Sequence, residues 1–129
     1  MNKIARIFLI TLGYLFAINS ALAHNTLTES VPPDQAVLTE SPDVIKLNFS
    51  DATYLEGIEL TTNEGKKIAL EFELIQTAAR QFSIPVPALG NGKYRVAWLV
   101  VGDDTHEIRG EFSFIVDSIS VDNAAVRSE

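Results

Sequence analysis

The stretch Tyr94-Arg95-Val96-Ala97-Trp98-Leu99-Val100 decides the fold class of this chain. Large apolar side chains stand at every second position, which is typical of a β-strand with one face buried. The segments 45–49 and 112–116 show the same period of two, and no helical period persists over ten residues beyond position 23. We therefore predict an all-β domain.

Outward from this stretch, turn signals separate further short strands. Asn63-Glu64-Gly65 predicts a hairpin, and Pro85 and Pro87 make the segment 82–86 an edge strand or an early-ending one. A polar loop or short hairpin is expected at 102–107. The predicted strands cover 26–30, 45–49, 58–60, 68–72, 82–86, 94–100 and 112–116. About seven strands at this spacing predict a single Greek-key sandwich or barrel.

The length and the start of the chain predict one exported domain. The chain has 129 residues and begins with a short basic segment, an apolar run from Ile7 to Ile18, and small residues at Ala21 and Ala23. This order is that of a secretory signal peptide, and the run is too short for a membrane-spanning helix. We expect a cleaved signal peptide at 1–23, a β-domain at 24–117 and a disordered tail at 118–129.

Charge and composition exclude several classes of function. The chain has 10 Lys and Arg against 17 Asp and Glu. Removal of Lys3 and Arg6 with the signal leaves 8 against 17, a net charge of −9. We expect no nucleic-acid binding and no stable membrane insertion of the mature chain. The chain has no cysteine, so it forms no disulfide and offers no thiolate to a metal or a substrate.

His24 would be the N-terminal residue after cleavage. It would then offer its α-amine and its imidazole Nδ1, which can close a six-membered chelate ring on one metal ion. Their reference pKa values are about 8 and about 6.5, so a metal displaces both protons at neutral pH. Such nitrogen donors favour Cu²⁺. An exposed N-terminal histidine without a role is the alternative.

Asp104 and His106 form a second candidate ligand pair. In an extended segment, side chains two residues apart point the same way and meet at one point. With the amine and imidazole of His24, the pair gives three nitrogens and one oxygen, which suits tetragonal Cu(II). The alternative for Asp-x-His in a polar loop is a solvated turn.

Two stretches resemble the CopC family of periplasmic copper-resistance proteins. One is 94–114, which contains Asp104 and His106. The other is an N-terminal pattern made of His24, Leu27, Ser30, Pro32, Leu38, Pro42, Val44, Leu47 and Phe49-Ser50. The resemblance extends from His24 to about Val116, and an N-terminal histidine combined with a late Asp-x-His is specific.

The resemblance implies a cupredoxin-like or immunoglobulin-like Greek-key β-barrel. It also implies a periplasmic, non-enzymatic protein that binds Cu(II) and acts in copper tolerance, homeostasis or trafficking. The implied ligands are His24 through amine and imidazole, Asp104 through an oxygen, and His106. A copper ion is the implied ligand, and a membrane copper transporter on a separate chain is a candidate partner. Met1 is the only methionine, so no methionine site for Cu(I) is expected.

Two other functions stay open from the sequence. An N-terminal histidine with a second histidine also occurs in the copper histidine brace of oxidative polysaccharide-cleaving enzymes, although such enzymes have larger domains with aromatic binding faces. A metal-free immunoglobulin-like interaction domain would leave the joint presence of His24, Asp104 and His106 as coincidence. For a copper-binding protein, protonation of the histidines weakens binding as the pH falls through about 6.5.

Overall fold

The computed structural model describes residues 26–73 and 77–118. The predicted signal peptide, His24 and residues 119–129 of the predicted tail lie outside the described residues. Within the described part the secondary structure is β only, and no helix there could cross a membrane. Its strands are β1 (Leu27–Val31), β2 (Ala36–Leu38), β3 (Val44–Thr62), β4 (Lys67–Ile68), β5 (Ala79–Pro85), β6 (Gly92–Val101) and β7 (Glu107–Val116).

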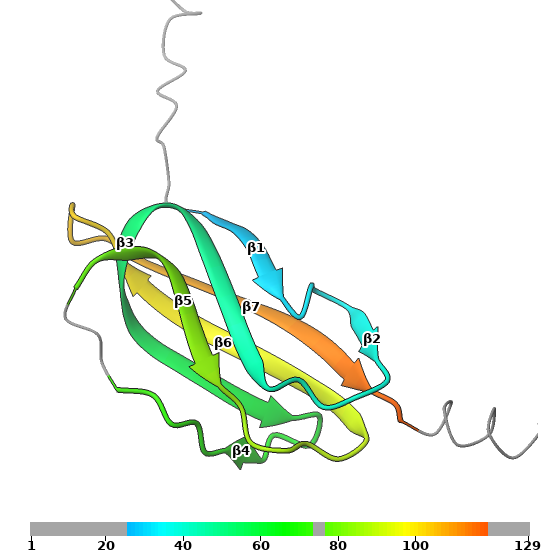
Figure 1. Cartoon of the computed structure of the whole chain (residues 1–129). Coiled ribbons are helices and arrows are strands. Elements are labelled where there is room, and N and C mark those ends of the chain that lie inside the picture. Colours follow the sequence, from blue (N-terminus) through cyan, green and yellow to red (C-terminus); the bar gives the residue numbers. More distant parts are fainter. Residues whose placement is uncertain (1–25, 74–76, 119–129) are drawn as a thin grey trace, which may run out of the picture.

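The long strand β3 belongs to both layers of the fold. Its first half pairs with β1 and β5, and its second half pairs with β6 and β4, all antiparallel. Strand β7 pairs antiparallel with β6, and the short β2 pairs parallel with β7. The result is a curled sheet whose two halves face each other (Figure 1). The predicted all-β Greek-key sandwich is confirmed.

The strand boundaries differ from the prediction in two places. The predicted strands at 45–49 and 58–60 are parts of the single strand β3, whose register shifts between Asn48 and Thr53 and again between Leu55 and Gly57. Such irregularities bend a strand without ending it. The strand predicted at 68–72 is only the two-residue β4, while the short β2 was not predicted. The edge position of β5 is confirmed, because β5 pairs with β3 alone.

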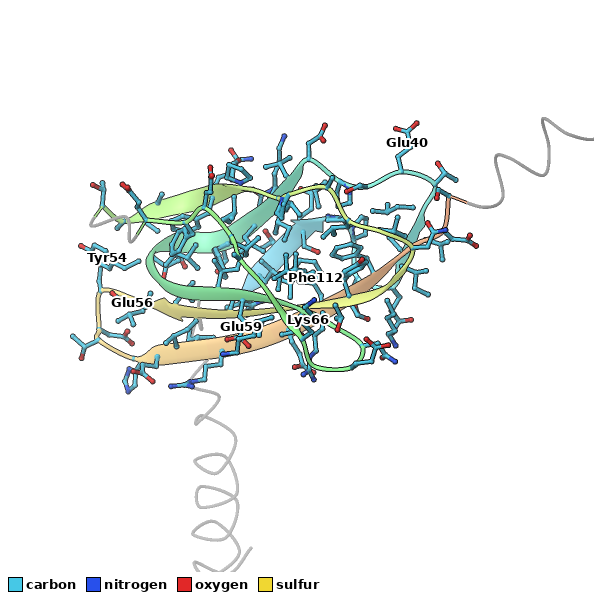
Figure 2. The ribbon with its side chains drawn as sticks, turned by 90° about the horizontal axis from the view of Figure 1, so that it is seen from below. Glu40, Tyr54, Glu56, Glu59, Lys66 and Phe112 are labelled. Atoms are coloured by element: carbon cyan, nitrogen blue, oxygen red, sulfur yellow. The ribbon has the colours of Figure 1, made fainter. Side chains whose placement is uncertain are left out.

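The core lies between the two layers and consists of the inward side chains of β3, β5, β6 and β7. Figure 2 shows Phe112 between the layers, with Tyr54 and Glu40 at opposite ends of the molecule. The fully or nearly fully buried apolar residues are Ile45, Leu47, Phe49, Leu55, Leu60, Phe82, Ile84, Tyr94, Val96, Trp98, Val100, Phe112, Phe114 and Val116. Their alternation along each strand is the period of two that predicted the fold.

Candidate metal centre

The loop that carries Asp104 and His106 connects β6 to β7. These strands pair up to Val101 and Glu107, so residues 102–106 close a tight hairpin. Gly102 N–H donates to the His106 carbonyl at 3.3 Å, and Thr105 N–H donates to the Gly102 carbonyl at 3.0 Å. The predicted hairpin at this position is confirmed.

The backbone within the loop is a turn, not the extended segment expected from the sequence. Residues 103 and 104 form the turn, and Thr105 has a φ of 65°, in the left-handed region. Asp104 and His106 therefore meet because the chain reverses between them. The expected proximity of the two side chains holds, although the expected reason for it was wrong.

Both carboxylate oxygens of Asp104 contact His106. Oδ1 accepts a hydrogen bond from the backbone N–H of His106 at 3.2 Å, and Oδ2 lies 2.8 Å from the imidazole Nδ1. The side-chain hydrogen bond, followed by the backbone one, lowers the pKa of Asp104 from its usual value of 3.8. An ionised carboxylate only accepts, so the 2.8 Å contact is a hydrogen bond in the tautomer that carries its proton on Nδ1 and its lone pair on Nε2. Nε2 has no hydrogen-bond partner in the described part of the chain.

The Asp104–His106 pair is open to solvent. The side chain of His106 is 82% exposed and that of Asp104 is 68% exposed. Two surface hollows of about 560 and 480 Å³ lie over other parts of β6 and β7, and neither is lined by this pair. An ion bound at the pair would therefore be accessible from the surrounding water.

Two ion pairs lie near this end of the molecule. Arg109 Nη2 contacts Glu107 Oε2 at 2.9 Å, at the start of β7. Arg80 Nη2 lies 3.6 Å from Asp51 Oδ1. No group of three or more His, Asp or Glu side chains is placed to hold a metal ion among residues 26–73 and 77–118. Of the predicted ligands, Asp104 and His106 lie within these described ranges and contact each other.

The start of the described chain lies at the same end of the sandwich as the loop (Figure 1). Thr26 is held to β3 by two hydrogen bonds: Ser50 N–H donates to the Thr26 carbonyl at 2.9 Å, and Thr26 N–H donates to Ser50 Oγ at 3.1 Å. Three residues further along β3, Thr53 Oγ1 donates to the carbonyl of Val101 at 2.8 Å. Val101 directly precedes the loop, so β3 connects the N-terminal segment to the loop through a short path.

Trp98 is a core residue, as predicted. It is 8% exposed, and its ring packs edge-to-face against Phe49 with a centroid distance of 5.2 Å and an interplanar angle of 77°.

The buried hydroxyl of Thr53 was missed by the sequence reasoning. A threonine in a strand is ordinary, so nothing in the sequence distinguishes this one.

Known proteins resemble both the sequence and the fold. The CopC domain family matches residues 27–117. Copper resistance protein C of Xanthomonas campestris pv. juglandis is 34% identical over 108 residues, which cover 75% of this chain and 83% of that protein. Protein YobA of Escherichia coli (strain K12) is 33% identical over 101 residues, which cover 75% of this chain and 82% of that protein.

The solved structures give the same answer for the fold. The crystal structure of PcoC, described as a methionine-rich copper resistance protein from Escherichia coli, superposes with a TM-score of 0.60 and 31% identity. That match covers 73% of this chain and 99% of the PcoC chain. The domain match, the two relatives and this superposition agree with the resemblance seen in the sequence, and the chain belongs to the CopC family.

Proposed function

We propose that the mature protein binds one Cu(II) ion in the periplasm and acts in copper tolerance, homeostasis or trafficking. The observation that carries this proposal is the contact between Asp104 and His106 in the exposed hairpin loop. Membership of the CopC family and the relatives named for copper resistance support the choice of metal. The signal peptide predicted at 1–23 supports the location.

The proposed donors are the amine and the imidazole of His24, one ring nitrogen of His106 and one carboxylate oxygen of Asp104. The pair that the structure describes fits this set. Nδ1 of His106 and Oδ2 of Asp104 are 2.8 Å apart. Two neighbouring ligands at right angles, with metal–ligand bonds of about 2.0 Å, also lie about 2.8 Å apart. Nδ1 and Oδ2 point at each other in this hydrogen bond, so metal binding requires the bond to break and the ring or the carboxylate to turn toward the ion.

The position of Thr26 supports a contribution from His24. Thr26 is fixed to Ser50 at the loop end of the sandwich, and His24 precedes it by two residues. Two residues span at most about 7 Å, so the anchored Thr26 confines the α-amine to this end of the molecule. The amine exists at this position only after cleavage, which ties the proposed site to export.

The composition supports Cu(II) over Cu(I). Cu(I) prefers thiolate and thioether sulfur. This chain has no cysteine, and its single methionine is Met1, within the predicted signal peptide. PcoC, by contrast, is described as methionine rich.

A binding protein, and not an enzyme, accounts best for the exposed pair. A metal at an open rim of the sandwich can exchange with incoming ligands, which suits storage, buffering or delivery. A membrane copper transporter on a separate chain is the proposed recipient or donor.

The proposal is tested by a Cu(II) competition titration of the chain that begins at His24. A chain with one extra residue before His24 and a His106→Ala variant serve as the two comparisons. Tight binding of one Cu(II) by the native chain, with large losses in both comparisons, is expected. Equal binding by the extended chain would remove the amine from the site, and absence of tight binding by the native chain would refute the proposal.

A further inference from the structure

Thr53 is a fully buried polar residue in the bend of β3. Its relative exposure is 0%, and the other buried polar residue among those described is Thr61 at 7%. Thr53 pairs with Ala79 of β5, while its neighbour Tyr54 pairs with Val101 of β6. Thr53 therefore stands at the point where β3 passes from one layer to the other.

The hydroxyl of Thr53 connects this point to the loop. Its Oγ1 donates to the carbonyl oxygen of Val101 at 2.8 Å, across 48 residues of sequence. Val101 is the last residue of β6, and Gly102 begins the loop that carries Asp104 and His106. The bond fixes the direction in which the chain leaves β6, because it holds the last carbonyl of the strand.

The same short segment of β3 also holds the N-terminal arm. The backbone N–H of Ser50 donates to the carbonyl of Thr26 at 2.9 Å. The Oγ of Ser50 accepts a hydrogen bond from the backbone N–H of Thr26 at 3.1 Å. We call residues 50–53 the β3 bend. One end of the β3 bend holds the chain that leads back to His24, and its other end holds the base of the loop.

We propose that Thr53 is a positioning residue for the copper site, which fixes the loop half of the site at a set distance from the N-terminal half. This inference rests on the proposed function. The hydroxyl does not contact the metal. It acts through Val101 on the loop, and a site built from two separate segments binds tightly only when both are held in place.

The experiment compares Thr53→Val, Thr53→Ala and Thr53→Ser with a matched control, Thr61→Val. Valine keeps the shape of threonine and removes the hydroxyl, whereas serine keeps the hydroxyl. Thr61 lies near the C-terminal end of the same strand, eight residues from Thr53, and is also buried. All variants are used as processed chains that begin at His24, at a temperature where circular dichroism shows them folded.

Two measurements are made on each variant. In the metal-free protein, hydrogen exchange of the Gly102 and Thr105 amides reports the order of the loop. With copper, competition titration gives the affinity, and electron paramagnetic resonance gives the ligand geometry. We expect Thr53→Val and Thr53→Ala to exchange these amides faster, to bind Cu(II) about 10–100-fold more weakly and to show an altered spectrum. Thr53→Ser and Thr61→Val should resemble the wild type.

Wild-type exchange, affinity and spectrum in a folded Thr53→Val or Thr53→Ala variant would overturn the inference. A Thr53→Ser variant as weak as the valine variant would also overturn it, because the hydroxyl would not be the cause. Failure of the wild type to bind Cu(II) would refute the proposed function separately, and unchanged amide exchange would then refute the positioning of the loop. If Thr53→Val does not fold, Thr53→Ala and Thr53→Ser decide the question.

Discussion

The indole ring of Trp98 occupies the space that a side chain at residue 110 would fill. Trp98 on β6 and Gly110 on β7 are directly paired. A Cβ atom added to Gly110 would lie 2.7 Å from Trp98 Cε2 and closer still to the neighbouring ring carbon. The ring also packs edge-to-face against Phe49, so it cannot move without disturbing the core.

Gly110→Ala should therefore destabilise the domain by about 1–3 kcal/mol or more, because an added methyl group overpacks a rigid site. The measurement is urea unfolding of the metal-free protein. Gly90→Ala is the control, since nothing lies within 4 Å of a Cβ there and the residue is exposed. The control should change the free energy of unfolding by less than about 0.5 kcal/mol. Equal stabilities of the two variants would contradict the packing described.

Trp98 should also report the binding of copper. It is the single tryptophan of the chain, and it lies three residues before Val101 on the strand that leads into the loop. Three residues of strand separate Trp98 from Val101 by about 10 Å. The loop follows directly, so a Cu(II) ion bound there should quench the fluorescence of Trp98. We expect quenching to saturate at one equivalent in the native chain and to be absent at that concentration in His106→Ala. Identical quenching curves for the two proteins would place the metal elsewhere.

Copper affinity should fall between pH 7.5 and pH 5, and nitrogen donors should cause the fall. The pKa of Asp104 is lowered from 3.8 by its bonds to His106, so this carboxylate stays ionised over that range. Any stability it contributes is present above pH 4 and is lost only as the pH drops through its lowered pKa. Imidazole and amine nitrogens, with reference pKa values of about 6.5 and about 8, must release protons to bind the metal.

An Asp104→Asn variant separates these contributions. It should bind Cu(II) about 10–100-fold more weakly than the wild type at pH 7.5. Its affinity should nevertheless fall with pH in parallel with that of the wild type, as measured by competition titration at several pH values. A flat profile in the wild type, or a slope that disappears in the variant, would show that the nitrogen donors are not responsible.

Tyr94→Phe should lower stability without changing copper binding. The Tyr94 hydroxyl donates to the carbonyl of Gly90 at 2.7 Å, and the residue is 7% exposed. Loss of this bond should cost about 0.5–1.5 kcal/mol in urea unfolding. Tyr94 lies near the start of β6, at the end of the strand opposite the loop. Copper affinity should therefore equal that of the wild type, and a weaker affinity would mean that strain passes along β6 to the site.

The sequence predicted most of the fold because the buried faces follow a strict period of two. Tyr94 to Val100 and Phe112 to Val116 are inward rows in the structure, as their alternation indicates. The pattern could not show that the strands at 45–49 and 58–60 are one. Two irregularities in register allow β3 to bend and continue, and such bends depend on partners that are distant in the chain.

The proximity of Asp104 and His106 was predictable from the sequence, but the geometry of their contact was not. The sequence indicated that Asp104 and His106 would be close, yet their contact depends on the left-handed Thr105, a residue that seldom adopts this conformation. The support from Thr53 could not be predicted, because its partner Val101 is 48 residues away. The predicted ligand His24 lies outside the described residues, and its part in the site stays a prediction.

The shared strand β3 also sets the order in which this protein can fold. Four other strands pair with β3, so neither layer is complete before it is in place. Most of these pairings join residues far apart in the chain, and such topologies fold slowly, with closure of long loops as the barrier. Thr53 pairs with β5 and its neighbour Tyr54 with β6, so the two halves of the proposed site lie together only once both layers have formed. Copper therefore meets a finished domain, unlike the zinc ion around which a zinc finger folds.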